Sequence, residues 1–164
     1  MIDFSQYTFL ALGSNLGNRK DNIIATLNEL RQHMTIIKKS KVYETKPIAG
    51  LSQANFYNMV LMVKEDFVPL DLLLCVQSIE RKIGRNKQAY WASREIDIDI
   101  IFQRNYIVEH VDLKIPHASY RLRDFVLQPL SDIAADYVPF GSEQKISEML
   151  ALCGSKNIIL EVEL

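Results

Sequence analysis

The feature of this sequence that most constrains its fold is the order in which the spacing of its apolar residues changes. Runs with the short spacing typical of strands are found at 7–12, 35–44, 56–63 and 95–102. Apolar residues at helical spacing follow the first and the third of these runs. The chain therefore predicts the order strand, helix, strand, strand, helix, strand.

The two expected helices have recognisable ends. Asn18 is a good N-cap, with Asp21 three residues later, and the helix after it has one apolar stripe that ends near Met34. Pro69 suits the first turn of the second helix, and Gly84 suits its C-terminal end. Both helices should therefore pack on the sheet through one face.

This order is that of an α+β, ferredoxin-like βαββαβ fold, an antiparallel sheet with both helices on one face. Further elements are expected toward the C-terminus: an added hairpin strand at 106–108, helices at 121–134 and 143–152, and a strand at 158–162. A length of 164 residues with 48% hydrophobic content suffices for a core and favours a single domain spanning 1–164.

Composition excludes several classes of partner. The net charge of −1 gives no general attraction to nucleic acid or to an anionic membrane.

The N-terminus lacks the pattern of a signal peptide, and no apolar run is long enough to span a bilayer. The two cysteines, Cys75 and Cys153, have neither zinc-type nor redox spacing and are expected to be reduced thiols. A cytoplasmic protein is expected.

The last predicted strand of the core order carries two carboxylates on one face. Side chains on a strand alternate, so Asp97 and Asp99 point to one side while the neighbouring isoleucines point to the other. Adjacent carboxylates repel each other, and Mg²⁺ beside phosphates is the cation that best compensates them. The alternative is the solvated face of an amphipathic strand.

Three further segments carry groups suited to a nucleotide. The long loop at 84–94 brings cations and aromatic rings directly before the carboxylates, which suits a triphosphate and a stacked base, although a solvated basic loop with Trp91 in the core is the alternative. The loop at 45–55 is also long for a hairpin, a feature that often marks function. His117 and Arg123 lie around an expected helix start, although His117 alone could be a capping or packing histidine.

Common catalytic motifs are missing from the sequence. The glycine-rich run at 13–20 lacks the Lys-Ser/Thr ending of a Walker A motif, and no nucleophile elbow or His-Glu-X-X-His helix is present. Metal-assisted phosphoryl chemistry is the class that remains.

The sequence also resembles a known family, the 6-hydroxymethyl-7,8-dihydropterin pyrophosphokinases of folate biosynthesis. The resemblance runs from Leu12 to Leu130 and rests on the order of its motifs. They are Gly13-Ser14-Asn15-Leu16-Gly17, Tyr43-Glu44-Thr45 with Pro47, Phe56-Tyr57-Asn58, Glu80 with Gly84-Arg85, Trp91 through Asp99, and Pro116-His117 with Arg123 and Phe125. It implies transfer of pyrophosphate from ATP to the pterin hydroxymethyl group, giving AMP, on a ferredoxin-like fold.

The resemblance also implies roles for individual residues. Asp97 and Asp99 resemble ligands of two Mg²⁺ ions, and together with Arg85 and Arg94 they form the implied catalytic set. The implied pterin pocket is Thr45, Ile48, Phe56, Asn58 and Phe125. The implied ATP site is Gln77, Glu80, Arg85, Lys87, Trp91, Arg94, Ile100, His117 and Arg123.

Some of these residues have simpler interpretations or depart from the family pattern. Asn58 could instead bond neighbouring backbone, and Glu80 is otherwise an ordinary exposed helix residue. The usual Trp-Gly-Pro-Arg run has Ala92 and Ser93 at its centre, and Lys87 replaces a common Arg, which keeps the charge but loses bidentate geometry.

Two alternatives to a pyrophosphokinase remain open. A two-metal nucleotidyl transferase or cyclase on the same fold would attack the α-phosphorus and release pyrophosphate rather than AMP. An RNA-binding module of the same topology is disfavoured by the near-neutral charge. The expected partners are therefore the small molecules ATP and 6-hydroxymethyl-7,8-dihydropterin, bound by a monomer.

Overall fold

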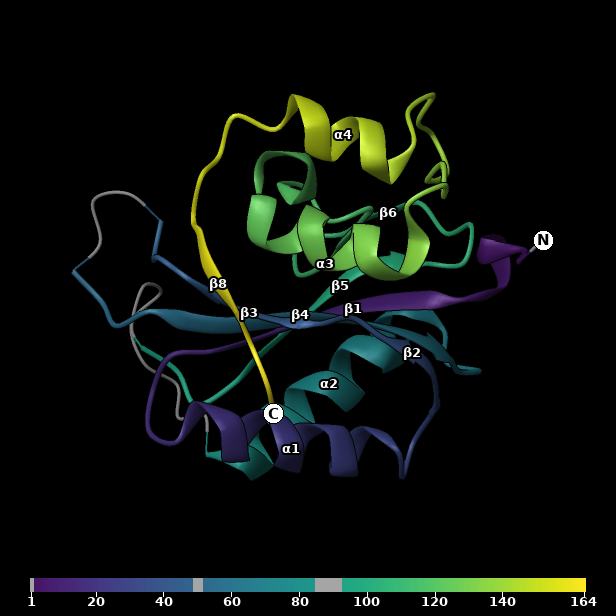
Figure 1. Ribbon diagram of the computed structural model, residues 1–164. Helices are drawn as coiled ribbons and strands as arrows, with labels where there is room; N and C mark the ends of the chain where they lie inside the picture. The colour runs from purple at the N-terminus through teal and green to yellow at the C-terminus, as the bar shows by residue number, and fades with distance from the viewer. Residues whose placement is uncertain (1, 49–51, 85–92) are drawn as a thin grey trace.

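An antiparallel sheet runs through the middle of the molecule, in a computed structural model that describes residues 2–48, 52–84 and 93–164 (Figure 1). Its strands are β1 (Thr8–Ser14), β2 (Thr35–Lys39), β3 (Val42–Thr45), β4 (Phe56–Lys64), β5 (Asp97–Gln103) and β8 (Ile158–Val162). They lie in the order β5-β1-β4-β3-β8, and β2 also pairs with β4. Strand β5, which begins with the two aspartates, is therefore at one edge.

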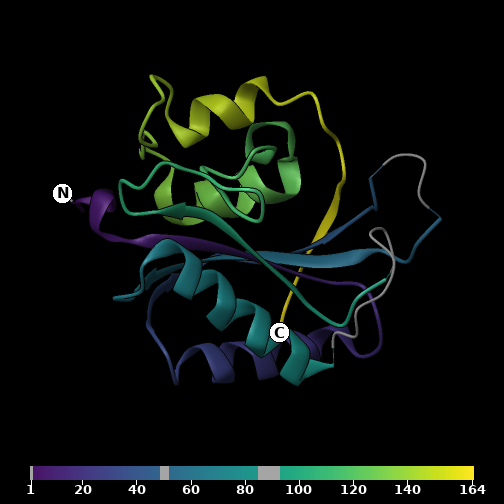
Figure 2. The same cartoon turned by 180° about the vertical axis from the view of Figure 1, so that it is seen from behind.

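Helices cover both faces of this sheet. α1 (Arg19–Leu30) and α2 (Pro69–Ile83) lie on one face, and α3 (Asp124–Ala134) and α4 (Ile146–Leu152) lie on the other, as the two opposite views agree (Figures 1 and 2). The predicted mixture of helices with an antiparallel sheet is confirmed. The C-terminal helices form a second layer across the sheet from α1 and α2.

The predicted start of α1 and both predicted ends of α2 are confirmed, whereas α1 ends at Leu30 and not near Met34. The side chain of Asn18 accepts a hydrogen bond of 3.3 Å from the backbone N–H of Asp21, which satisfies one of the free donors at the start of α1. Pro69 is the first residue of α2, and Gly84 ends it with φ of 127°, a conformation that L side chains rarely adopt.

The predicted strand at 35–44 is two strands, β2 and β3, and both pair with β4. Ser40 lies at the break. Its N–H donates to the carbonyl of Val60, and the N–H of Val60 donates to the Ser40 hydroxyl at 2.8 Å. A side chain thus replaces one rung of the backbone ladder, which an apolar pattern alone does not reveal.

The alternating side chains of the sheet build two cores. Ile98 and Ile100 face α1 and α2, where they pack with Leu12 and Ile23. On the other face, Phe9, Val60, Ile101, Phe102 and Tyr137 pack beneath α3 and α4. Phe9 and Tyr137 stack with their ring centroids 5.4 Å apart, a separation favourable for aromatic pairs.

The remaining elements refine the predicted C-terminal part. The expected strand at 106–108 is a separate hairpin of β6 (Val108–Glu109) and β7 (Lys114–Ile115). The expected helix at 121–134 begins as the 3₁₀ turn η2 (Tyr120–Leu122), and Arg123 is extended, with φ of −120° and ψ of 102°, before α3. A short 3₁₀ turn, η1 (Phe4–Gln6), precedes β1.

The other C-terminal predictions fall close to the observed bounds. The expected helix at 143–152 begins only at Ile146, as α4, and the strand predicted at 158–162 is β8. Within the described ranges, no helix has the length and apolar character that crossing a membrane requires.

Candidate active site

A cavity of about 580 Å³ opens where β5 meets the loops around it. Most of the predicted site residues line it: Thr45, Ile48, Phe56, Asn58, Gln77, Glu80, Arg94, Asp97, Asp99, His117, Arg123 and Phe125. Arg85, Lys87, Trp91 and Ala92 lie outside the described residues, which resume at Ser93. Segments from five distant parts of the sequence therefore meet at one place.

Asp97 and Asp99 face this cavity from the edge strand. Both are partly exposed. Ile98, which lies between them, is only 5% exposed, and Ile100, which follows Asp99, is only 4% exposed, as the alternation of the strand predicts. Arg94 places its Nη1 atom 3.0 Å from Asp97 Oδ2, and Arg123 places its Nη1 atom 3.7 Å from Asp99 Oδ2. Each carboxylate therefore has a guanidinium beside it, which offsets their mutual repulsion.

The aspartate pair also fits a divalent cation. Within 2–48, 52–84 and 93–164, no group of three or more His, Cys, Asp or Glu side chains lies close enough to hold a metal by itself. Mg²⁺, however, usually takes only one or two protein carboxylates and completes its shell with water and substrate phosphates. Two carboxylates in a cavity lined by guanidinium groups match that requirement.

His117 faces Asp99 as a neutral ring. Burial, reinforced by the positive charge of Arg123, lowers the pKa of His117 to about 4 despite the opposing effect of Asp97. Its Nδ1 accepts a hydrogen bond of 3.2 Å from the backbone N–H of Ser119, which leaves the proton on Nε2. The 3.8 Å between Nε2 and Asp99 Oδ2 is therefore not an ion pair at neutral pH, and the ring presents an N–H to the cavity.

Asn15 is a residue whose role the sequence interpretation missed. It is only 3% exposed, and its Oδ1 accepts a hydrogen bond of 2.8 Å from the backbone N–H of Arg94. The backbone N–H groups of Asn15 and Leu16 both donate to the Arg94 carbonyl at 3.1 Å. The motif at 13–17 thus fixes the backbone that presents Arg94, and the motif itself was the available signal.

The opposite side of the cavity is built on β3 and β4. Asn58 donates from Nδ2 to Thr45 Oγ1 at 2.6 Å, so its amide bonds a side chain and not the neighbouring backbone. Gly13 lies opposite Asn58 on one side and opposite Asp97 on the other. It belongs to β1 rather than to a turn, and a Cβ there would lie 2.9 Å from Asn58 Oδ1, so only glycine leaves this space open.

One alternative for a side chain near β5 is wrong, and the ATP-site role of Ile100 stays a prediction although Ile100 is not among the described residues that line the cavity. Glu80 is 4% exposed rather than an exposed helix residue, and its Oε1 accepts a hydrogen bond of 2.8 Å from the backbone N–H of Ile98, between the two aspartates. Ile100 does not line the cavity with the other predicted residues, because its side chain points into the core beneath α1 and α2. Strand alternation already places Ile100 on the face opposite the aspartates.

Other lining residues were not predicted. Lys46, Gln53 and Asp112 also border the cavity. Lys46 lies between Thr45 and Pro47, so its neighbours in the sequence were the available signal. Asp112 comes from the turn of the β6–β7 hairpin, and nothing in the sequence places that turn beside β5.

The chain matches the sequence profile of the family described as 7,8-dihydro-6-hydroxymethylpterin-pyrophosphokinase (HPPK) over residues 9–135. It is 37% identical over 130 residues to the Aquifex aeolicus protein named 2-amino-4-hydroxy-6-hydroxymethyldihydropteridine pyrophosphokinase, covering 79% of this chain and 81% of that one. A Bacillus subtilis protein of the same name is 37% identical over 127 residues, which are 76% of each chain.

Longer proteins also contain a region similar to this chain. The folic acid synthesis protein FOL1 of Dictyostelium discoideum is 41% identical over 130 residues, and the match covers only 20% of its length. The Plasmodium falciparum HPPK-DHPS structure superposes with a TM-score of 0.71 at 17% identity, over 89% of this chain and 44% of that one, which shows a shared fold. Together with the profile match and the relatives of similar length, these findings establish that the chain belongs to the 7,8-dihydro-6-hydroxymethylpterin-pyrophosphokinase family.

Proposed function

We infer that the protein transfers pyrophosphate from ATP to the hydroxymethyl group of 6-hydroxymethyl-7,8-dihydropterin, giving AMP and the pterin diphosphate in folate biosynthesis. Family membership over residues 9–135, with relatives of similar length that carry the corresponding enzyme name, is the observation that carries this conclusion. The cavity at β5 contains the groups that this reaction needs.

We propose that the pterin binds on the side formed by β3, β4 and the start of α3. Phe56 and Phe125 both line the cavity and offer flat apolar faces for the ring. Asn58 and Thr45 offer an amide and a hydroxyl that already share one hydrogen bond. An amide both donates and accepts, as the mixed polar edge of a pterin requires.

ATP is proposed to bind along the β5 edge, with its phosphates toward Arg94, Arg123 and His117. The two guanidinium groups are always charged and bind phosphate oxygens in a forked geometry. The neutral His117 ring adds an N–H donor without adding charge. Gln77 and Glu80 border the same part of the cavity from α2. Arg85, Lys87 and Trp91 are proposed to contribute from the neighbouring loop.

Asp97 and Asp99 are the residues proposed to hold two Mg²⁺ ions. When bound, the ions would neutralise charge on the phosphates and favour the deprotonated hydroxyl of the pterin. The side chains of this protein hold the two substrates so that the hydroxyl faces the β-phosphorus in line with the departing AMP. Orientation alone can supply roughly 7–11 kcal/mol of the barrier reduction. Arg94 is proposed to stabilise the charge that develops during transfer.

We further propose that the sheet is of the ferredoxin-like kind and that the enzyme is a cytoplasmic monomer. The order β5-β1-β4, followed by β2 and β3 on the other side of β4, supports the first proposal if β2 and β3 count as one interrupted strand. A monomer predicts a particle with the mass of one chain of 164 residues. Light scattering measures the mass of the particle.

The decisive experiment is to incubate the protein with ATP, Mg²⁺ and 6-hydroxymethyl-7,8-dihydropterin and to identify the products by phosphorus NMR. We expect AMP and a pterin diphosphate in equal amounts, and no AMP when the pterin is left out. Release of inorganic pyrophosphate instead would indicate attack at the α-phosphorus, and the chain would then be a nucleotidyl transferase or cyclase.

A further inference from the structure

The first residue of α3 is a buried carboxylate that does not face the cavity. Asp124 is 6% exposed and lies between Arg123 and Phe125, which both line the cavity. Its two oxygens accept hydrogen bonds from a segment more than 30 residues later in the chain. Oδ1 accepts from Ser155 Oγ at 2.8 Å and from Asn157 Nδ2 at 2.9 Å. Oδ2 accepts from the backbone N–H of Asn157 at 2.6 Å and from that of Ile158 at 3.1 Å.

These hydrogen bonds determine the charge of Asp124. Burial raises the pKa of the Asp124 carboxyl, but the hydrogen bonds from Asn157, Ser155 and Ile158 outweigh that effect and lower its pKa overall. The group is therefore a charged acceptor whose donors all come from one short segment. Hydrogen bonds to a charged acceptor are about twice as strong as neutral ones.

Asn157 also contacts the other side of the cavity. Its carbonyl accepts a hydrogen bond of 2.8 Å from the backbone N–H of Lys46, and the next residue, Ile158, pairs with Thr45 across β8 and β3. Lys46 and Thr45 line the cavity together with Ile48. One residue near the C-terminus thus bonds both to the helix that carries Phe125 and to the segment that carries Thr45.

We propose that Asp124 and Asn157 are positioning residues for the pterin substrate, forming a C-terminal clasp that sets the distance between the Phe125 wall and the Thr45–Ile48 wall. This proposal rests on the function proposed above. Neither residue is among the described residues that line the cavity, so both act through their neighbours. The segment that completes the clasp, 155–158, lies beyond residues 9–135, where the family match ends.

The clasp can be opened by exchanging a single oxygen for nitrogen. In Asp124→Asn, an NH₂ group replaces Oδ1 and faces the Asn157 amide NH₂ and the Ser155 hydroxyl. The hydroxyl can turn to accept, but the Asn157 NH₂ cannot, so the clasp loses that hydrogen bond with almost no change in volume. We expect the KM and the directly titrated Kd for the pterin to rise about tenfold, which corresponds to the loss of a typical hydrogen bond to a charged group. The KM for ATP should change less than the pterin KM, because Arg123, which precedes Asp124, is also held beside Asp99 at 3.7 Å, whereas the Thr45–Ile48 wall is bonded to the clasp.

A reciprocal exchange tests whether the contact itself matters. Asn157→Asp alone places a second carboxylate against Asp124 and should weaken pterin binding. In the double variant Asp124→Asn with Asn157→Asp, the new amide at position 124 donates to the new carboxylate at position 157 and still accepts from the backbone. We expect this double variant to recover pterin affinity to within about threefold of the parent, a strong coupling between contacting residues.

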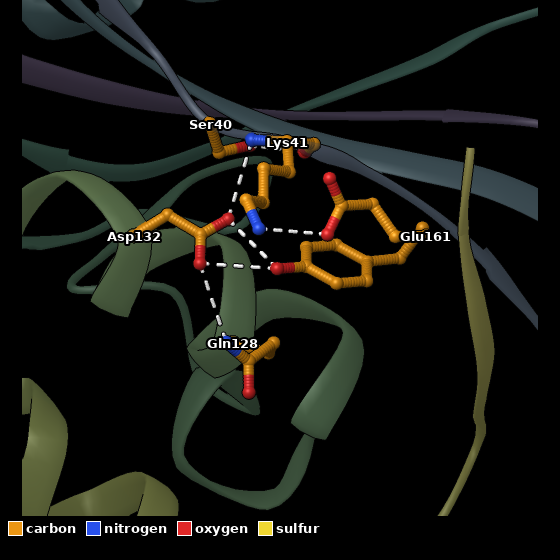
Figure 3. Close-up of polar contacts among 6 residues, drawn as sticks. Ser40, Lys41, Gln128, Asp132 and Glu161 are labelled. Atoms are coloured by element: carbon orange, nitrogen blue, oxygen red, sulfur yellow. Dashed lines mark hydrogen bonds and ion pairs between the residues drawn. The ribbon is translucent and has the colours of Figure 1, made fainter. Parts of the chain in front are cut away.

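A matched control lies near the other end of the same helix. Asp132 accepts hydrogen bonds from the hydroxyl of Tyr43, from the backbone N–H of Lys41 and from Gln128, and Lys41 in turn pairs with Glu161 (Figure 3). Asp132→Asn therefore also weakens the attachment of α3 to β3, but at residues that are not among those lining the cavity. It should lower the Tm while leaving the KM for the pterin within about twofold of the parent.

The outcomes separate the clasp from the function itself. If the parent makes no AMP and pterin diphosphate, the proposed function fails, whatever the variants do. If the parent is active and Asp124→Asn lowers the Tm with no change in pterin KM, the clasp is merely structural and the proposal is wrong. An equal rise in pterin KM for Asp132→Asn would also overturn it. Should Asp124→Asn not fold, Ser155→Ala removes one hydrogen bond and is expected to raise the pterin KM about threefold.

Discussion

At the scale of single residues, the two aspartates at the start of β5 carry the chemistry proposed for this protein. Each lies beside a guanidinium group, and both face the same cavity. Alternation along the strand predicted their common orientation. The sequence did not reveal that Asn15 fixes the backbone of Arg94 or that Glu80 supports the N–H of Ile98. Those contacts join positions more than 15 residues apart.

Replacing either aspartate by asparagine should remove the charge that a cation requires. We expect Asp97→Asn and Asp99→Asn each to lower kcat by at least about 100-fold at saturating Mg²⁺, since even residues behind a metal ligand often contribute 10- to 100-fold. The rate of AMP formation measures the effect. Asp136→Asn is the control, because that side chain is 83% exposed and pairs with Lys145. Near-parental turnover of both cavity variants would contradict the metal assignment.

Gly13 should be required for the open space between Asn58 and Asp97. In Gly13→Ala the added Cβ would lie 2.9 Å from Asn58 Oδ1, so the amide, which is held by the bond from its Nδ2 to Thr45 Oγ1, must move. We expect the pterin KM to rise roughly fivefold or more, because overpacking of this kind typically costs 1–3 kcal/mol.

The matched control for this change is Gly154→Ala, since nothing lies within 4 Å of a Cβ at position 154. It should leave the pterin KM unchanged. Equal kinetics for the two alanine variants would show that the space beside Gly13 has no role in binding.

At the scale of elements, the sequence predicted best what local chemistry determines. The cap at Asn18, the proline at the start of α2 and the glycine at its end placed both helices correctly, because each acts within a few residues. The expected strand at 7–12 stopped short of Gly13, and Ser40 was placed inside a single strand, for the opposite reason. A glycine that suits a turn lies inside β1 beside Asn58, and a serine within an apolar pattern divides one predicted strand into two.

The break at Ser40 should contribute measurably to stability. Ser40→Ala leaves the buried N–H of Val60 without the hydroxyl that accepts its hydrogen bond, and we expect the free energy of unfolding to fall by about 1–3 kcal/mol. Urea denaturation measures the change. Ser78→Ala removes an exposed hydroxyl that donates to the Cys75 carbonyl and should cost under about 0.5 kcal/mol. Similar losses in both variants would show that the strand break contributes nothing special.

At the scale of the whole molecule, the cavity exists only because distant segments converge. Spacing alone identified the aspartate strand and two unusual loops, and the family resemblance supplied the remaining site residues. The bonds of the 155–158 segment to α3 and β3, and the position of the β6–β7 turn beside the cavity, could not be predicted from the sequence, because they depend on how the C-terminal third packs over the sheet. No local pattern encodes that packing.

Global stability should depend on pH through Asp124. Its pKa is lower in the folded protein than the ordinary value of 3.8, so the folded state binds its proton less readily than the unfolded state does. The stability that this carboxylate contributes is therefore fully present well above pH 3.8 and is lost as the pH falls through the lowered folded value.

Denaturation of the parent and of Asp124→Asn between pH 7 and pH 3 measures this dependence. We expect the difference in unfolding free energy to be constant above about pH 5 and to shrink below it. A difference that stays the same down to pH 3 would mean that the charge of Asp124 makes no contribution to folding.

The layer beneath α1 has a practical consequence for engineering. Ile23, Leu27 and Leu30 fill it with exposures of 0–4%, and none of them is among the described residues that border the cavity. Conservative substitutions at these positions change how strongly the chain resists heat without altering any of the described side chains that border the cavity. A thermostable variant suited to manufacture is best sought there.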